Sequence, residues 1–301
     1  MQTGTVMNEL MTTKEVAAYL RIKERKVYDL VAEGEIPFTK ATGKYLFPKH
    51  LIDLWLARTA SFPLINHGNA LPAPPVIVGS HDPLLEWAVR TSECGLAIMP
   101  GGSLDGVERF AKGQAVACGM HILDITDGGY NVSVASQSTV GLECVLLEWA
   151  WREQGLITRH SDEHLQSLTA AIKSNCQFIL REPQAGSRVL FQHLINEAGY
   201  TLADLTILDD EARSETDLGM AILEIRADAG LGIRTVAHQL GLHFVPLQRE
   251  RYDLLIRRRD FFEGPMARLM AFTKTDEFKA RAAEMQGYDI SGIGSVHFNP
   301  T

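Results

Sequence analysis

The stretch TTKEVAAYLRIKERKVYDLVAEGEIP (residues 12–37) decides the fold of the N-terminal part of the chain. It opens with Thr12 and Glu15 at the spacing of a capping box, in which each side chain accepts a hydrogen bond from the other residue's backbone N–H group. Apolar residues then return every three or four positions, which is the period of a helix with one buried face. We therefore expect a helix over residues 13–20.

A second helix is expected over residues 24–33, because its apolar positions recur at i, i+3 and i+4. Gly34 is typical of the position just past a helix end. The segment that follows predicts two short strands around residues 41–44, forming a hairpin with basic residues at its tip. A last helix over residues 49–58 would close the unit.

This order of helix, turn, helix, Gly-Glu-Ile-Pro, basic hairpin and closing helix resembles the excisionase-type, MerR-like winged helix-turn-helix DNA-binding domain over residues 10–58. The resemblance implies that the helix over residues 24–33 enters the major groove of DNA, while the hairpin holds the phosphate backbone. Glu24 and Asp29 add negative charge to that face. An acidic side chain such as Glu24 can nevertheless accept a hydrogen bond from cytosine. The residues expected to contact DNA are Lys23, Glu24, Arg25, Lys26, Tyr28, Lys40 and Lys44.

Composition separates this N-terminal head from the rest of the chain. The length of 301 residues suits about two domains. The composition, 46% hydrophobic and 22% charged, is that of a globular protein. Residues 1–60 have a net charge of +2 and the other residues of −10, within a total of −8. A basic head on an acidic body is expected when only the head contacts phosphate.

Location and domain limits also follow from sequence features. The first twenty residues lack the basic and apolar segments of a secretory signal, and no apolar run is long enough to span a bilayer, so we expect a cytoplasmic protein. The four cysteines stand far apart, which predicts buried thiols. Residues 61–75 contain four prolines, one glycine and no charge, as in a semi-stiff linker. We expect a DNA-binding domain at 1–60, a linker at 61–75 and a ligand-binding domain at 76–301.

After the linker, segments typical of strands alternate with segments typical of helices, which predicts an α/β fold. Asp82 and Pro83 are residues typical of the cap and the first position of a helix. The ordered landmarks are VIVGSHDPLLEWAVR (76–90), PGGSLDGVERFAKGQA (100–115), AVACGMHILD (115–124), FILREPQAGSRVLFQHLINEAG (178–199) and GYDISGIGSV (287–296).

These landmarks resemble the PBP-like domain of bacterial regulators and molybdenum-cofactor proteins, which is related to molybdate-binding proteins. The resemblance covers residues 75–297. It implies the type II periplasmic-binding-protein fold, a two-lobed α/β clamp whose chain crosses twice between the lobes. The fold class expected for the whole chain is therefore α/β, with a small winged helix-turn-helix domain followed by this periplasmic-binding-protein-like domain.

The clamp is expected to bind an anion, because backbone N–H groups at helix starts are unpaired and the helix dipole favours negative charge there. The resemblance implies that Ser80, Ser103 and the backbone amides of Ala185 and Gly186 stand where molybdate-binding relatives contact their oxyanion. The chain reads Gln-Ala-Gly-Ser-Arg at 184–188, where family members often read Gly-Ser-Gly-Thr-Arg. The candidate ligand-binding residues are Ser80, His81, Gly102, Ser103, Gln184, Ala185, Gly186, Ser187, Thr216 and Asp228.

We expect neither a cofactor nor a metal site nor an enzyme. His81 and His121 have no second histidine at metal spacing, and no nucleophile elbow, P-loop, H-E-x-x-H or dinucleotide motif is present. The head and clamp together predict a ligand-responsive transcription regulator that senses molybdate or tungstate. Because one short recognition helix offers little contact, it should act on DNA as a homodimer.

Three other interpretations remain open from the sequence. The chain could be a cytoplasmic oxyanion carrier linked to molybdenum-cofactor metabolism, an accessory protein of molybdenum-cofactor synthesis, or a regulator that senses a small organic acid. A carrier would not need the DNA-binding head, so the head favours a regulator.

Overall fold

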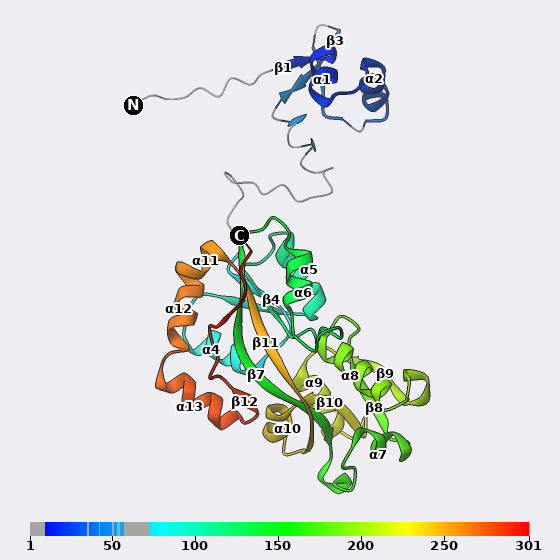
Figure 1. Cartoon of the computed structure of the whole chain (residues 1–301), viewed down its shortest axis with the longest axis vertical. Helices are drawn as coiled ribbons and strands as arrows, with labels where there is room; N and C mark the ends of the chain where they lie inside the picture. The colour runs from blue at the N-terminus through cyan, green and yellow to red at the C-terminus, as the bar shows by residue number, and fades with distance from the viewer. Residues whose placement is uncertain are drawn as a thin grey trace. The chain divides into compact units, whose positions relative to one another are not determined.

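The structure is a computed structural model of the whole chain (Figure 1). It describes residues 10–34, 36–41, 43–49, 51–52, 55–56 and 73–300. The chain forms two compact units, residues 1–70 and 71–301. Of the predicted linker, only residues 73–75 are among those described.

The two helices of the N-terminal unit begin and end close to their predicted limits. Helix α1 (Thr13–Leu20) starts at the expected capping box, in which Glu15 Oε2 lies 2.7 Å from the Thr12 backbone nitrogen. Helix α2 (Glu24–Ala32) buries its predicted apolar face. Gly34 has a φ of +71°, a left-handed conformation that glycine adopts without strain.

A three-stranded antiparallel sheet completes this unit. Strands β2 (Thr39–Ala41) and β3 (Lys44–Pro48) form the predicted hairpin, and β1 (Leu10–Thr12) pairs with the other edge of β3. The sequence did not predict β1, because three residues are too few to show alternation. The expected closing helix is helical at its described positions, 49, 51–52 and 55–56, and the other positions of 49–58 lie outside the described residues.

Within residues 73–300, ten strands form one sheet in the order β5-β4-β6-β11-β7-β10-β8-β9, with β12 and β13 paired to β7. The strands are β4 (Val76–Gly79), β5 (Ala97–Pro100), β6 (Ala117–Met120), β7 (Cys144–Thr158), β8 (Gln177–Arg181), β9 (Thr206–Ala212), β10 (Ala229–Ile233), β11 (His243–Arg257), β12 (Tyr288–Asp289) and β13 (Val296–Phe298). The helices are α4 (Pro83–Thr91), α5 (Ser103–Ala111), α6 (Val132–Ser138), α7 (Leu168–Lys173), α8 (Gly186–Glu197), α9 (Glu215–Leu223), α10 (Arg234–Leu240), α11 (Arg258–Phe262), α12 (Gly264–Phe272) and α13 (Asp276–Met285).

This sheet is divided into two lobes that share β7 and β11 (Figure 1). These two strands of 15 residues pair antiparallel along their length. Strands β4–β6 with α4–α6 and α11–α13 form the first lobe, and β8–β10 with α7–α10 form the second. The predicted two-lobed clamp with two crossings is thereby confirmed.

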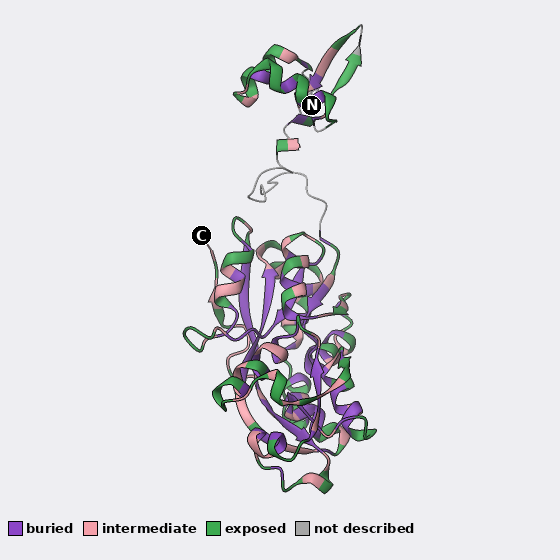
Figure 2. Cartoon of the chain, turned by 90° about the vertical axis from the view of Figure 1, so that its right-hand side faces the viewer, coloured by how far each residue is buried: buried purple, intermediate pink, exposed green. Residues whose placement is uncertain are grey.

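Each lobe has its own hydrophobic core, and the buried residues follow the sheet while the helices expose their outer faces (Figure 2). Trp149 and Phe278 are fully buried in the first lobe, and Phe178 and Phe191 in the second. Separate cores joined by two strands are the arrangement that hinge closure requires. The four cysteines are buried and unpaired, as predicted. In the described part of the chain, no helix has the length and apolar character needed to cross a membrane.

Candidate functional site

The residues predicted to contact DNA lie on α2 and on the β2–β3 hairpin. All seven are exposed, and aromatic contacts hold the two elements together. The Tyr45 ring lies edge-on to Tyr28 of α2, at a centroid distance of 6.3 Å, and Lys40 Nζ lies 5.6 Å from the Tyr45 ring centroid. The recognition helix and the basic hairpin therefore form one continuous surface.

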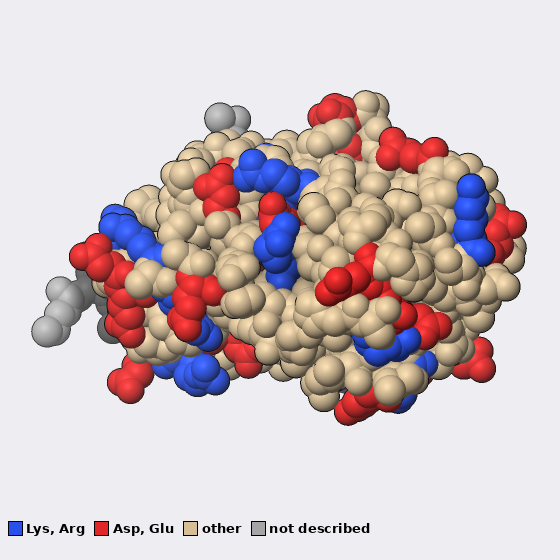
Figure 3. All heavy atoms as spheres, turned by 90° about the horizontal axis from the view of Figure 1, so that it is seen from below, with Lys and Arg blue, Asp and Glu red and all other residues tan. Residues whose placement is uncertain are grey.

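Acidic and basic side chains are interspersed on the face of the molecule seen in Figure 3, which has no continuous basic area. Such a face offers little to a phosphate backbone.

In the first lobe, three polar residues from strand ends and a helix start meet in the interior. Ser80 follows β4, Ser103 begins α5 and His121 follows β6. Ser80 Oγ lies 2.8 Å from His121 Nε2, and the His121 backbone N–H donates to Ser103 Oγ at 3.3 Å. All three are buried, so the predicted residues Ser80 and Ser103 do share one site.

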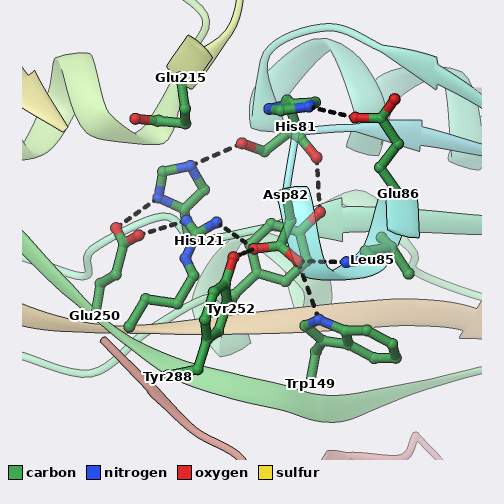
Figure 4. Close-up of polar contacts among 12 residues, drawn as sticks. His81, Asp82, Leu85, Glu86, His121, Trp149, Glu215, Glu250, Tyr252 and Tyr288 are labelled. Atoms are coloured by element: carbon green, nitrogen blue, oxygen red, sulfur yellow. Dashed lines mark hydrogen bonds and ion pairs between the residues drawn. The ribbon is translucent and has the colours of Figure 1, made fainter. Parts of the chain in front are cut away.

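The shared strands extend this site with a buried ionic network, drawn in Figure 4. His121 Nδ1 lies 2.7 Å from Glu250 Oε2 of β11. Glu250 Oε1 accepts from the Arg152 guanidinium and, at 3.0 Å, from Gln154 Nε2, both of β7. Arg152 Nη1 also donates to Asp82 Oδ2 at 2.9 Å. The network thus links the first lobe to both hinge strands.

Glu250 and Arg152, at the centre of this network, are held in their charged forms. Burial raises the pKa of Glu250, but the positive charges of Arg152 and His121 outweigh burial and lower it to about 2. Burial lowers the pKa of Arg152, and the carboxylates of Glu250 and Asp82 more than restore it. At neutral pH Glu250 and Arg152 therefore form a buried ion pair between the two hinge strands.

Asp82 anchors the first lobe to the same network. It caps α4 as predicted, since its Oδ1 accepts from the Leu85 backbone at 2.8 Å. It also accepts from Trp149 Nε1 at 3.1 Å and from the Tyr288 hydroxyl at 2.7 Å. One side chain thus joins the start of α4 to β7 and β12.

The second lobe meets the first at the starts of α5 and α8. The Leu104 backbone N–H lies 3.3 Å from the Gln184 carbonyl oxygen. A Cβ atom at Gly102 would clash with that carbonyl group, and one at Gly186 would clash with the backbone oxygen of His121. The two lobes are therefore closed on each other, and glycine permits this close approach.

Buried polar atoms without a partner gather around this contact. Within the described residues, Ser187 Oγ, Glu215 Oε2, Gln154 Oε1 and Arg152 Nε are buried and make no hydrogen bond. Ser187 and Arg181 line a cavity of about 10 Å³, roughly the space of one water molecule. Glu215 Oε1 pairs with Arg181 at 2.7 Å.

The register of the sheet brings Glu215 close to the strand pair that carries Gln154. Glu215 Oε2 would lie 3.4 Å from a Cβ atom at Gly232, and the next residue of β10, Ile233, pairs with Gln154. Figure 4 shows Glu215 across from His121. Because unpaired buried groups are costly, they mark where a ligand would gain most by binding.

Two predicted ligand residues lie elsewhere. Asp228 pairs with Arg159 at 2.8 Å, at the end of β10 away from the lobe contact, so its inclusion was wrong. The physical reason is that residues 228–230 begin a strand, whereas helix-starting loops follow strand ends. Thr216 is exposed on α9, and its neighbour Glu215 is the residue that points inward.

His81 is buried and lies beside this region, with its Nε2 3.0 Å from Glu86 Oε2. Its Nδ1 is buried and has no hydrogen-bond partner among the described residues, so the ring is only half satisfied.

Sequence reasoning missed the charged members of the site, Arg152, Glu215 and Glu250. No local signal marked Arg152 or Glu250, because each stands among other polar residues, in Arg-Glu-Gln (152–154) and in Gln-Arg-Glu-Arg (248–251). A charged residue inside a buried strand requires a buried partner of opposite charge.

Two family models match the chain: a helix-turn-helix domain at residues 10–60 and a PBP superfamily domain at residues 86–274. The uncharacterized protein YvgK of Bacillus subtilis (strain 168) is 22% identical over 306 residues, covering 96% of this chain and 99% of that protein.

Solved structures share the two-lobed fold at low sequence identity. The sulfate-binding protein SubI of Mycobacterium tuberculosis H37Rv has a TM-score of 0.52 at 12% identity, covering 72% of this chain and 86% of that one. A putative phosphate ABC transporter substrate-binding protein from Clostridium perfringens, with bound phosphate, has a TM-score of 0.51 at 13% identity, covering 73% and 98%. The tungstate ABC transporter structure from Geobacter sulfurreducens has a TM-score of 0.50 at 10% identity, covering 69% and 97%.

Proposed function

The chain belongs to the PBP superfamily, and from that premise we propose that it is a cytoplasmic transcription regulator whose two-lobed unit senses a small oxyanion. The observation that carries the proposal is the pairing of an exposed helix-turn-helix surface with a two-lobed unit that buries serine hydroxyls at strand ends and helix starts of both lobes. The matches to a helix-turn-helix domain and to a PBP superfamily domain support a binder rather than a catalyst.

The donors in the cleft support an oxyanion. Arg152 Nε can only donate, Ser187 Oγ can donate, and both lack a protein acceptor. A tetrahedral oxyanion between the lobes would accept from both, and charge-assisted hydrogen bonds are the stronger ones. Molybdate or tungstate, the effectors expected from sequence, are our first candidates. The solved relatives whose titles name phosphate, sulfate and tungstate support the class of ligand.

Two atoms favour a second candidate. Gln154 Oε1 and the second oxygen of Glu215 accept hydrogen bonds and lack donors. A fully deprotonated dianion would repel the Glu215 carboxylate, whereas a ligand with its own O–H group would donate to it. Hydrogen phosphate or a small hydroxy acid would satisfy this requirement.

A thermal-shift panel on the full chain tests the proposal. It should contain molybdate, tungstate, sulfate, phosphate and small hydroxy acids. A ligand at 100 times its Kd stabilises the protein by about 2.7 kcal/mol. If only a hydroxy acid stabilises the protein, the two-lobed unit binds a small ligand but the oxyanion proposal is wrong. If none of these compounds stabilises it, the whole proposal is contradicted.

We expect the Arg25→Ala and Lys44→Ala variants to bind the chain's own promoter DNA more weakly. Each removes an exposed positive charge from the head, one from α2 and one from the hairpin. Losing a phosphate contact should reduce the salt dependence of log K by about one unit of slope. Fluorescence anisotropy at several salt concentrations measures both effects.

Lys112→Ala is the matched control for these variants, because it removes an exposed lysine that follows the last residue of α5 in the C-terminal unit. It should bind DNA like the wild type. If Arg25→Ala and Lys44→Ala also did so at every salt concentration, the DNA-binding surface would be wrongly placed.

The protein should be a homodimer, because one head offers too little contact for tight operator binding and two would read a palindrome. Light scattering at micromolar concentration should give twice the 33.3 kDa chain mass. A monomer both with and without DNA would count against this arrangement.

A further inference from the structure

Two histidines and a glutamate meet at the end of the second lobe where β7 ends and β11 begins. His160 lies in the short 3₁₀ turn His160–Asp162, Glu163 follows it, and His243 is the first residue of β11. The sheet register pairs His243 with Thr158, which brings residues about eighty positions apart in sequence to one spot. Because Gln154 pairs with Gln248 on the same two strands, this spot is separate from the ligand cleft.

The three side chains have the geometry of a metal-binding group. One ligand atom of each lies within 4.8 Å of the other two. His160 Nδ1 lies 3.0 Å from Glu163 Oε1, and the two imidazole rings have a centroid distance of 6.3 Å. Small side-chain rotations would place all three around one ion.

His243 supplies an independent sign of a missing partner. Its Nε2 is buried and makes no hydrogen bond to any residue that the structure describes. A buried imidazole nitrogen without a partner is unfavourable. The side chains of His160 and Glu163 are 62% and 61% exposed, so an ion can reach their ligand atoms from solvent.

We propose that His160, Glu163 and His243 bind a divalent transition-metal ion, with Zn²⁺ as the ion that fits best. Two imidazoles and one carboxylate are a ligand set typical of zinc, with a fourth position open to water or to a side chain of another molecule. Calcium and magnesium prefer all-oxygen sites, so the histidines exclude them. The sequence predicted no metal site, because only the fold brings His243 to the other two residues.

Zinc titration of the tag-free full chain by calorimetry tests this site. The wild type should bind about one Zn²⁺ per chain. The His160→Ala and His243→Ala variants should each bind Zn²⁺ at least about 100-fold more weakly than the wild type. Even residues that only hold the metal ligands in place contribute about 10- to 100-fold to metal affinity. Cobalt added in place of zinc should give a visible absorption band in the wild type and not in these variants.

His193→Ala is the matched control. His193 Nε2 lies 3.5 Å from Glu197 Oε1 on α8, a similar surface pair without a second histidine. It should leave zinc affinity unchanged. Binding by the wild type only at millimolar zinc, or equal losses in His193→Ala and His160→Ala, would overturn the proposal. His160 is exposed, so its variant gives an interpretable result even if His243→Ala fails to fold.

Discussion

Replacement of Arg152 by methionine should destabilise the C-terminal unit by about 3–5 kcal/mol, which is the usual loss when one partner of a buried ion pair is removed. The Arg152 side chain is 1% exposed, and its partners Asp82 and Glu250 have side chains with no exposure at all. Methionine keeps an apolar side chain about as long as the stem of arginine, but it lacks the guanidinium group and so leaves both carboxylates without this positive charge. The guanidinium also lies 4.5 Å from the Tyr252 ring, and that contact would be lost as well.

Urea unfolding, monitored by tryptophan fluorescence, measures this loss. Trp149 donates to Asp82, so the signal reports on the network itself. Arg249→Met is the matched control, because Arg249 is next to Glu250 on β11 and pairs with Asp289 at 2.9 Å, with 59% and 46% of the two side chains exposed. An exposed pair contributes about 0–1 kcal/mol. Equal losses in the two variants would show that the buried charges do not stabilise the hinge.

The N-terminal unit could be predicted almost completely because its signals are local. The capping box at Thr12, the apolar spacing of α2 and the glycine at position 34 each specify backbone geometry within a few residues. The short strand β1 escaped prediction because its pairing with β3 is a tertiary contact.

In the C-terminal unit, local sequence patterns predicted individual elements but not the contacts between residues far apart in the sequence. Asp82 was predicted as a helix cap, and it is one, but its bonds to Arg152, Trp149 and Tyr288 depend on residues 67 to 206 positions away in sequence. Strand β7 is buried on both faces along most of its length, so it lacks the alternation that marks a strand.

Two errors in the ligand site have simple physical causes. Thr216 and Glu215 are neighbours at the start of α9, and one helical residue turns the side chain by about 100°. A prediction that is right about the loop can therefore choose the wrong side chain. At Asp228, glycine and charge indicated a turn, but they do not say whether the turn precedes or follows a strand.

The Ser80→Ala/Ser103→Ala double variant should lose most of its affinity for the effector. A hydrogen bond to a charged group contributes about 1.5–3 kcal/mol, which corresponds to a loss of roughly 10- to 100-fold for each hydroxyl. Both hydroxyls contact His121 in the closed lobes, and Ser187, near the start of α8 in the second lobe, has a buried hydroxyl without a partner among the described residues. Because the ligand can close the clamp only through its higher affinity for the closed state, weaker binding should also reduce its effect on DNA affinity.

Calorimetry with molybdate and with hydrogen phosphate, on the wild type and the double variant, tests this site. Ser136→Ala is the control, since Ser136 Oγ donates to the Ser133 carbonyl on α6, outside the helix-starting loops. We expect about one anion per chain in the wild type and in Ser136→Ala. If hydrogen phosphate binds and molybdate does not, the acceptors Gln154 Oε1 and Glu215 Oε2 select a protonated ligand. If the double variant binds either anion as tightly as the wild type does, the anion binds outside the cluster of Ser80 and Ser103. The prediction that these two hydroxyls hold the ligand is then wrong.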